Sequence, residues 1–157
     1  MPGSPGDVFP FFSMAENLDE LTPPWLHFRI LTELPVEMKT GALIDYKLRI
    51  RMLPIRWRSK ITAWEPPHRF IDEQVRGPYR RWAHEHTFLE QDEGILVRDR
   101  VEYAVWGGSI INRLLVRPDL DRIFSYRFEK REELFPPAPR QMICSQVRGS
   151  MELMGRL

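Results

Sequence analysis

Hydrophobic and polar residues alternate through most of the segment from Leu43 to Tyr103, a pattern typical of strands with one face against a core and the other in solvent. Clusters of turn-forming residues interrupt the alternation at positions 51–54, 65–68, 77–79 and 91–94. The pattern therefore predicts five antiparallel strands joined as consecutive hairpins.

The lengths of these turns predict which residues face each other on neighbouring strands. The last two turns place Asp72 opposite His84 and His86 opposite Asp99. Since side chains on the same side of a sheet alternate along each strand, all four residues are expected on one face.

That face, which we call the inner face, is otherwise apolar. A first turn of four residues, pairing Ile50 with Ile55, keeps the division of faces consistent over all five strands. The apolar inner residues are Ile44, Tyr46, Leu48, Trp57, Ile61, Phe70, Trp82, Phe88, Val97, Val101 and Tyr103, and the polar ones are Ser59, Asp72, Gln74, His84, His86 and Asp99. Burying polar groups without partners is costly, so these six are the candidates for a functional site.

The segments before and after the strands are predicted to form helices. Short helices are expected at residues 7–12, with Asp7 as N-cap, and at residues 16–21, followed by a strand over residues 25–32. A longer helix is expected from Pro118 to Phe135, with an inward stripe formed by Leu120, Ile123, Phe124, Arg127, Arg131 and Leu134. The prediction is an α+β protein in which a curved antiparallel sheet wraps around a long C-terminal helix.

Composition sets the domain boundaries. Residues 1–6 are rich in Pro, Gly and Ser and are expected to be a disordered lead-in, residues 7–135 form a single domain, and residues 136–157 are a Pro-rich linker and tail expected to be disordered. A chain of 157 residues with 43% hydrophobic residues suits one globular domain.

Charge and cysteine content exclude several classes of protein. The net charge is +1 with both signs interleaved, which argues against a nucleic-acid partner. A single cysteine, Cys144, fits a reducing compartment, and no apolar run is long enough to span a membrane. We therefore expect a cytoplasmic location.

Several motifs resemble those of a known superfamily. They include residues 21–26 (LTPPWL), 41–46 (GALIDY), 69–82 (RFIDEQVRGPYRRW), 84–88 (HEHTF) and 99–103 (DRVEY). In these motifs and in its order of elements, the chain resembles the START-related SRPBCC superfamily (Bet v 1-like, polyketide cyclase-like), in its small bacterial ligand-binding branch. The resemblance implies the helix-grip fold with a hydrophobic ligand cavity between sheet and long helix.

Family members usually begin with a strand that this chain lacks. The missing strand would leave a sheet edge exposed, and we expect residues 142–147 or a second copy of the chain, forming a homodimer, to cover it.

Three functions remain open. The first is binding of a small hydrophobic or amphipathic molecule (lipid, aromatic or polyketide-like) by Tyr46, Trp57, Ser59, Asp72, Gln74, Trp82, His84, His86, Asp99 and Tyr103. The second is a cyclase, dehydratase or isomerase in which His86 and Asp99 form a catalytic acid/base pair. The third is a protein-interaction module that uses the open edge.

No cofactor and no metal is expected. The best metal candidate from spacing is His84 and His86 with Glu90, which resembles part of a cupin signature. The later histidine of that signature is absent, and Glu90 falls at a turn, so the histidines are expected to line a cavity with their carboxylate partners.

Overall fold

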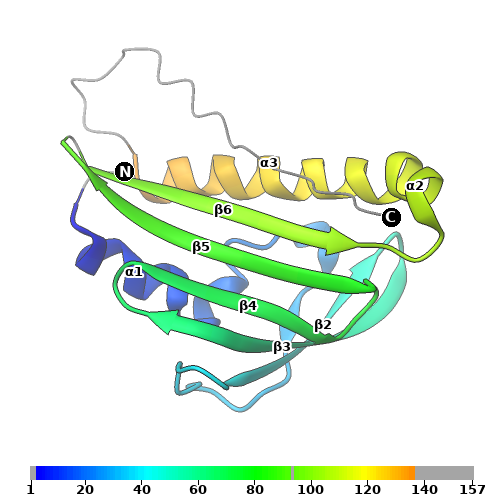
Figure 1. Ribbon diagram of the computed structural model, residues 1–157, viewed down its shortest axis with the longest axis horizontal. Helices are drawn as coiled ribbons and strands as arrows, with labels where there is room; N and C mark the ends of the chain where they lie inside the picture. Colours follow the sequence, from blue (N-terminus) through cyan, green and yellow to red (C-terminus); the bar gives the residue numbers. More distant parts are fainter. Residues whose placement is uncertain (1–2, 93, 137–157) are drawn as a thin grey trace.

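The structure, a computed structural model, describes residues 3–92 and 94–136. A six-stranded antiparallel sheet, with its strands in sequence order, curves around a long C-terminal helix (Figure 1). The strands are β1 (Arg29–Ile30), β2 (Leu43–Ile50), β3 (Leu53–Glu65), β4 (Arg69–Arg76), β5 (Arg81–Gln91) and β6 (Gly94–Ala104). This is the predicted α+β helix-grip architecture.

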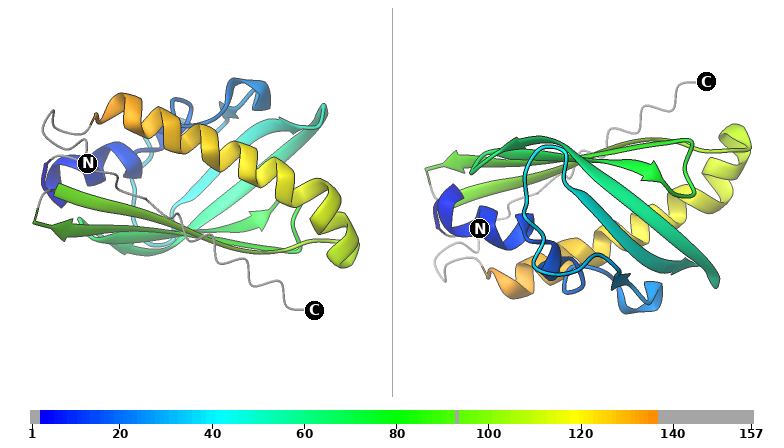
Figure 2. Two further views of the ribbon diagram at one scale, coloured as in Figure 1. Left: turned by 90° about the horizontal axis from the view of Figure 1, so that it is seen from above. Right: turned by 90° about the horizontal axis from the view of Figure 1, so that it is seen from below.

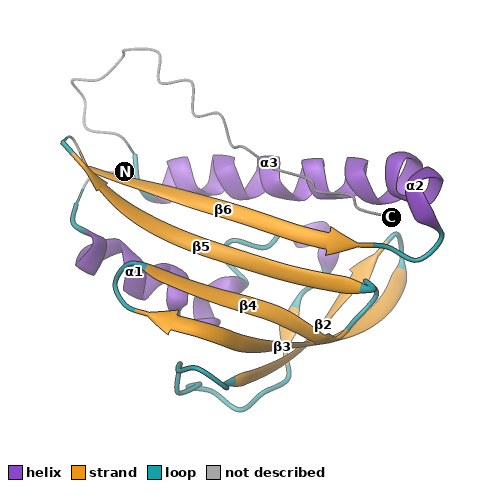
Figure 3. Cartoon of the chain, in the orientation of Figure 1, coloured by secondary structure: helices purple, strands orange, loops and turns teal. Residues whose placement is uncertain are grey.

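Helical segments lie on the concave side of the sheet. Views from above and below show α3 (Arg117–Leu134) crossing that side at an angle to the strands (Figure 2), and α2 (Gly108–Ile111) with η3 (Asn112–Val116) leads into it without a break. The N-terminal segments α1 (Pro5–Ser13), η1 (Ala15–Leu18) and η2 (Pro24–Leu26) occupy the same side (Figure 3). None of these helices is long and apolar enough to cross a membrane.

Helix α1 begins earlier than predicted. The hydroxyl and backbone N–H of Ser4 both donate to the carboxylate of Asp7, so Ser4 is the N-cap and Asp7 is the third helical residue. Pro5 and Gly6, which the composition placed in the lead-in, are therefore helical. The helix inserts Phe9 and Phe12 against Phe88 and closes one end of the core.

The strand predicted over residues 25–32 is wrong for most of its length. The prolines before Trp25 favour a tight 3-10 turn, and His27 takes a left-handed conformation with φ of 46°, which breaks the extended run. Strand β1 is limited to Arg29 and Ile30, and the backbone N–H groups of Leu31 and Thr32 both donate to the carbonyl of Asp45 on β2.

The sheet register agrees with the prediction from β3 onward at the positions that matter for the site. Ile61 lies opposite Asp72, Asp72 opposite His84, and His86 opposite Asp99. Two irregularities in the β3–β4 ladder bend the sheet, the first between Arg58 and Ser59.

The first hairpin differs from the prediction. Arg51 and Met52, with φ of 49° and 71°, form a two-residue turn, so that Ile50 pairs with Leu53 and not with Ile55. Two-residue turns with positive φ match the twist of paired strands, but neither residue is a type that favours them. The shift is two residues, so every side chain keeps its predicted face.

Two predictions fall on parts of the chain that the structure does not describe. The proposed covering strand at residues 142–147 and the tail from residue 137 lie outside the described residues. Within the described part of the chain, β6 is an edge strand that pairs with β5 alone. That a second copy of the chain covers an exposed edge of the sheet stays a prediction.

Candidate functional site

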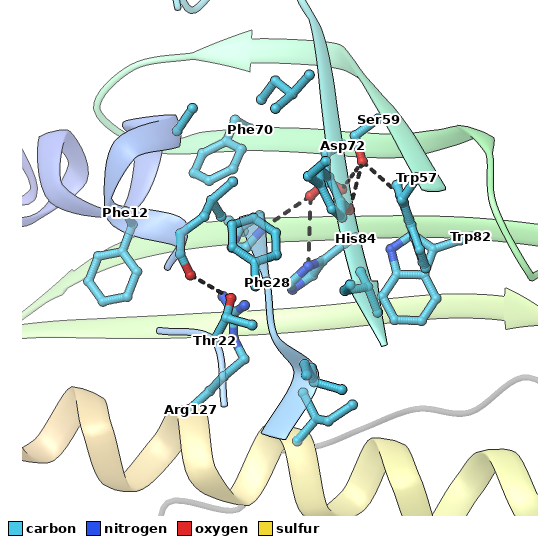
Figure 4. Close-up of a pocket in the computed structure, with 18 of the residues that line it drawn as sticks. Phe12, Thr22, Phe28, Trp57, Ser59, Phe70, Asp72, Trp82, His84 and Arg127 are labelled. Carbon is cyan, nitrogen blue, oxygen red and sulfur yellow. Dashed lines mark hydrogen bonds and ion pairs between the residues drawn. The ribbon is translucent and has the colours of Figure 1, made fainter. Parts of the chain in front are cut away.

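A cavity of about 160 Å³ lies between the inner face of the sheet, the N-terminal segments and α3. Most of its wall is apolar or aromatic, including Phe12, Phe28, Trp57, Phe70 and Trp82, which are labelled among the lining residues in Figure 4. Its size is close to that of a dry cavity able to hold one benzene ring, about 150 Å³. The occupant that fits without rearrangement is therefore a molecule of about one aromatic ring.

Four polar side chains from three adjacent strands form one wall of the cavity. They are Ser59 on β3, Asp72 on β4, and His84 and His86 on β5. The two histidines are two residues apart, so alternation points both inward, and the β4–β5 register places Asp72 beside them. Asp99, on β6, lies behind the histidines.

The hydrogen bonds among these groups run diagonally across the strands. His84 Nε2 lies 3.1 Å from Asp99 Oδ1, and His86 Nε2 lies 3.3 Å from Asp72 Oδ2. The residues directly opposite each other are also close, with His86 Nδ1 3.0 Å from Asp99 Oδ1 and His84 Nδ1 3.7 Å from Asp72 Oδ2, but neither contact has hydrogen-bond geometry. Each imidazole therefore has one nitrogen toward Asp72 and the other toward Asp99.

Two arginines of α3 reach this cluster. Arg131 Nη1 donates to Asp99 Oδ2 over 3.3 Å, and Arg127 extends from the helix into the cavity (Figure 4). The sequence pattern placed both arginines on the inward stripe of the helix but did not assign them to the site. The pattern shows which side of the helix faces the sheet but not which strands lie opposite each residue. Two guanidinium groups thus accompany the two carboxylates and two imidazoles inside the protein.

The cluster shifts the pKa of its members in different directions. Burial would raise the pKa of Asp99, but the hydrogen bond with His84, the close contact with His86 and the charges of both histidines outweigh it and hold that pKa well below its usual range. Burial acts in the same direction on Asp72, and the hydrogen bond with His86 together with the charges of both histidines leaves its pKa lowered. Both carboxyl groups are therefore ionised at neutral pH.

The two histidines have opposite pKa shifts although they lie side by side. Burial, reinforced by the charge of His86, lowers the pKa of His84. Burial also acts to lower the pKa of His86, but the hydrogen bond with Asp72 and the carboxylate of Asp99, 3.0 Å from the ring, outweigh it, and that pKa is raised. His86 is therefore the imidazole that takes up a proton first.

A second chain of hydrogen bonds links the cluster to the aromatic wall. Trp57 Nε1 donates to Ser59 Oγ over 3.1 Å, Ser59 Oγ donates to Asp72 Oδ1 over 3.3 Å, and Tyr46 OH lies 3.3 Å from the same Ser59 oxygen. Burial raises the pKa of Tyr46 well above its usual value, so this phenol keeps its proton. Ser59 thus connects Tyr46 and Trp57 to the carboxylate.

The structure brings seven of the ten predicted binding residues to the cavity wall: Tyr46, Trp57, Ser59, Asp72, Trp82, His84 and His86. The other three are occupied elsewhere. The Gln74 amide donates to and accepts from the backbone of Tyr79, the Tyr103 hydroxyl donates to Asn112, and Asp99 lies behind the histidines. Gln74 shares the predicted face, but the turn after β4 captures its side chain.

Three donor groups of the wall are close enough to share a metal ion. One ligand atom each from Asp72, His84 and His86 lies within 4.8 Å of the others. Glu90, the carboxylate suggested by spacing, is exposed near the end of β5, opposite Ile95, so it cannot join the histidines.

Comparison with known proteins shows the fold alone. The structure of protein Ms6760 from Mycobacterium smegmatis matches with a TM-score of 0.59 and 14% identity, over 84% of this chain and 83% of that one. The structure of TTHA0849 from Thermus thermophilus matches with a TM-score of 0.55 and 17% identity, over 85% of this chain and 90% of that one. No family model and no curated protein matches the chain.

Proposed function

We propose that the protein binds a small aromatic or amphipathic molecule in the cavity between the sheet and α3. The observation that carries the proposal is the cavity itself, whose aromatic wall ends in the polar groups Ser59, Asp72, His84 and His86. Pockets with mostly apolar walls and a few convergent polar groups are the usual form of small-molecule sites.

The size and charge of the cavity narrow the class of ligand. A volume of about 160 Å³ suits one ring better than a lipid chain. Arg127, which lines the cavity, favours a ligand with an acidic oxygen, and the buried histidines can exchange hydrogen bonds with it. A phenol or an aromatic acid satisfies both requirements.

We also propose, on the order of elements and the cavity, that the chain belongs to the START-related SRPBCC superfamily. A cytoplasmic location and a homodimer through the sheet edge remain predictions alongside it.

The first test is whether the purified chain carries or takes up such a molecule. Native mass spectrometry compared with denaturing mass spectrometry reveals any retained organic compound, and titration with phenol, benzoate and toluene measures binding directly. We expect phenol and benzoate to bind more tightly than toluene and to change the fluorescence of Trp57 and Trp82, which line the cavity.

A pair of variants connects binding to the cavity. Ile44 is 4% exposed and lines the cavity, so Ile44→Phe should fill part of it and weaken phenol binding at least about tenfold. Val75→Phe adds a similar ring on the outer side of β4, where Val75 is 58% exposed, and should leave binding unchanged. Equal affinity in both folded variants, or no binding by the wild-type chain, would contradict the proposal.

A second candidate function is acid/base catalysis in the same cavity. Two features favour it. Asp72, His84 and His86 lie on the cavity wall, where they can reach a bound molecule. Asp99 contacts both histidines on the side away from the cavity, as a carboxylate does when it orients a catalytic imidazole. A compound retained by the wild-type chain should then change mass during incubation, and His86→Gln should slow that change by ~10²-fold or more while the compound still binds. An unchanged mass over the same period favours binding alone.

A further inference from the structure

The arrangement of Asp72, His84 and His86 also suits the donor set of a metal site. Only one pairing among the three, His86 Nε2 to Asp72, has hydrogen-bond geometry. His84 Nδ1 also points toward the same carboxylate oxygen but lies 3.7 Å from it, too far for a hydrogen bond.

The two separations that involve Asp72 are close to those between ligands of one metal ion, and all three donor atoms lie within 4.8 Å of one another. Donor atoms of a tetrahedral zinc site with bonds of about 2.0–2.1 Å lie about 3.3 Å apart. Asp72 Oδ2 lies 3.3 Å from His86 Nε2 and 3.7 Å from His84 Nδ1. Two imidazole nitrogens and one carboxylate oxygen are also a common donor set for divalent transition metals.

Asp99 occupies the position of a carboxylate that supports metal-binding histidines. Its Oδ1 atom lies 3.1 Å from His84 Nε2, with hydrogen-bond geometry, and 3.0 Å from His86 Nδ1, without it; both are the ring nitrogens directed away from Asp72. Metal-bound histidines usually donate their second N–H to such a carboxylate, which fixes the tautomer and the ring orientation. Arg131 binds the other oxygen of Asp99 and holds the carboxylate in place.

The environment leaves room for further ligands of the metal. Asp72, His84 and His86 all line the cavity, so a fourth position faces the open space and not the protein interior. Three protein ligands with one open position are typical of metal sites that bind a substrate or a small ligand.

We propose that Asp72, His84 and His86 bind one divalent transition-metal ion at the polar end of the cavity, with Asp99 as the carboxylate that orients both histidines. The inference goes beyond the proposed function, because metal binding does not require an organic ligand. An acidic oxygen of a ligand in the cavity would complete the coordination.

The test uses the full chain, free of affinity tags, treated with chelator and carrying Cys144→Ser to remove its single thiol. Titration with Zn²⁺ or Co²⁺ alone, followed by calorimetry and by the visible absorption of Co²⁺, should show one ion per chain. The Co²⁺ spectrum should be that of a site with nitrogen and oxygen donors and low coordination number.

Substitutions then identify the ligands. Asp72→Asn and His86→Gln should weaken Co²⁺ binding more than 100-fold, and Asp99→Asn should weaken it about 10- to 100-fold because it acts through the histidines. His68→Gln changes an exposed histidine, and Glu73→Gln changes the exposed carboxylate next to Asp72, so both should bind as the wild type does.

Failure of stoichiometric binding by the folded Cys144→Ser chain would overturn the inference whatever the further variants do. Binding that persists in folded Asp72→Asn and His86→Gln proteins would overturn it as well. The binding of phenol and benzoate is measured on chelator-treated protein, in the absence of metal. A negative result for metal binding is therefore independent of the result for binding of the organic ligand.

Discussion

Asp72 and Glu73 are consecutive carboxylates on β4 that lie in opposite environments. Asp72 faces inward, among Ser59, His84 and His86, whereas Glu73 faces outward and accepts a hydrogen bond from Thr62 in an exposed position. The same contrast holds over the sheet, because each of its two faces carries side chains of opposite charge that pair across neighbouring strands. It shows that the same cross-strand pairing has very different consequences on the two faces.

Exposure accounts for the difference. On the outer face, Asp45 and Arg58 form two hydrogen bonds of 2.7 Å, but their side chains are 36% and 46% exposed. On the inner face, the side chains of His86 and Asp99 are 5% and 17% exposed. Water can replace the partner of an outer charge, whereas an inner charge that loses its partner remains in an apolar interior.

The largest expected effect comes from removing the inner carboxylate that contacts both histidines and Arg131. Asp99→Ala should lower the free energy of unfolding by about 3–5 kcal/mol, because Arg131 and the histidines lose their charge partner inside the protein. Urea denaturation measures the change. The control is Glu102→Ala, which removes an outer carboxylate from the same strand. Similar losses in the two variants would show that the faces do not differ as described.

A smaller difference between the faces should appear on acidification of chelator-treated protein. The pKa values of Asp72 and Asp99 are lower in the folded state than the usual 3.8, so their contribution to stability is present above that value and is lost as the pH falls through the folded-state values. Stability measured from pH 5 downward should therefore fall steeply below about pH 4. In Asp99→Asn protein this acid-dependent loss should be smaller, and an equal loss would rule out the inner cluster as its cause.

The smallest effect is expected on the outer face. Arg58→Gln removes the partner of Asp45, but both groups are in contact with water, so the urea midpoint should change little. Any change should shrink further in about 1 M salt, which screens exposed charges. A shift as large as that of Asp99→Ala would contradict the comparison.

Sequence patterns predicted the faces of the sheet better than its contacts. Alternation and turn length placed Asp72, His84, His86 and Asp99 together, since a strand has only two faces and the last turns set the register. The same reasoning could not predict that the hydrogen bonds run diagonally, because side-chain torsions decide this and the sequence does not specify them.

Side-chain contacts, both local and between distant segments, were the main part that the sequence did not reveal. The first hairpin turn was wrong by two residues because Arg51 and Met52 carry no signal for positive φ, and Arg51 is held in place by Asp119 of α3. Gln74 fits the pattern of a cavity residue, but its amide binds the backbone of Tyr79. Arg51 is thus held by a residue distant in the sequence, whereas the Gln74 side chain is held by the turn that follows its own strand; in each case side-chain contacts overrode the local pattern.

The stacking of His86 on Phe70 has a consequence for how the site can be observed. The two rings are nearly parallel, with centroids 4.1 Å apart, and the ring of His84 lies 3.8 Å from His86 on centroids. Protons above an aromatic face experience its ring current and resonate at unusually high field in a nuclear magnetic resonance spectrum. The carbon-bound protons of His86 therefore stand apart from those of the exposed histidines, and they give the site its own signal for protonation, metal and ligand without any added label.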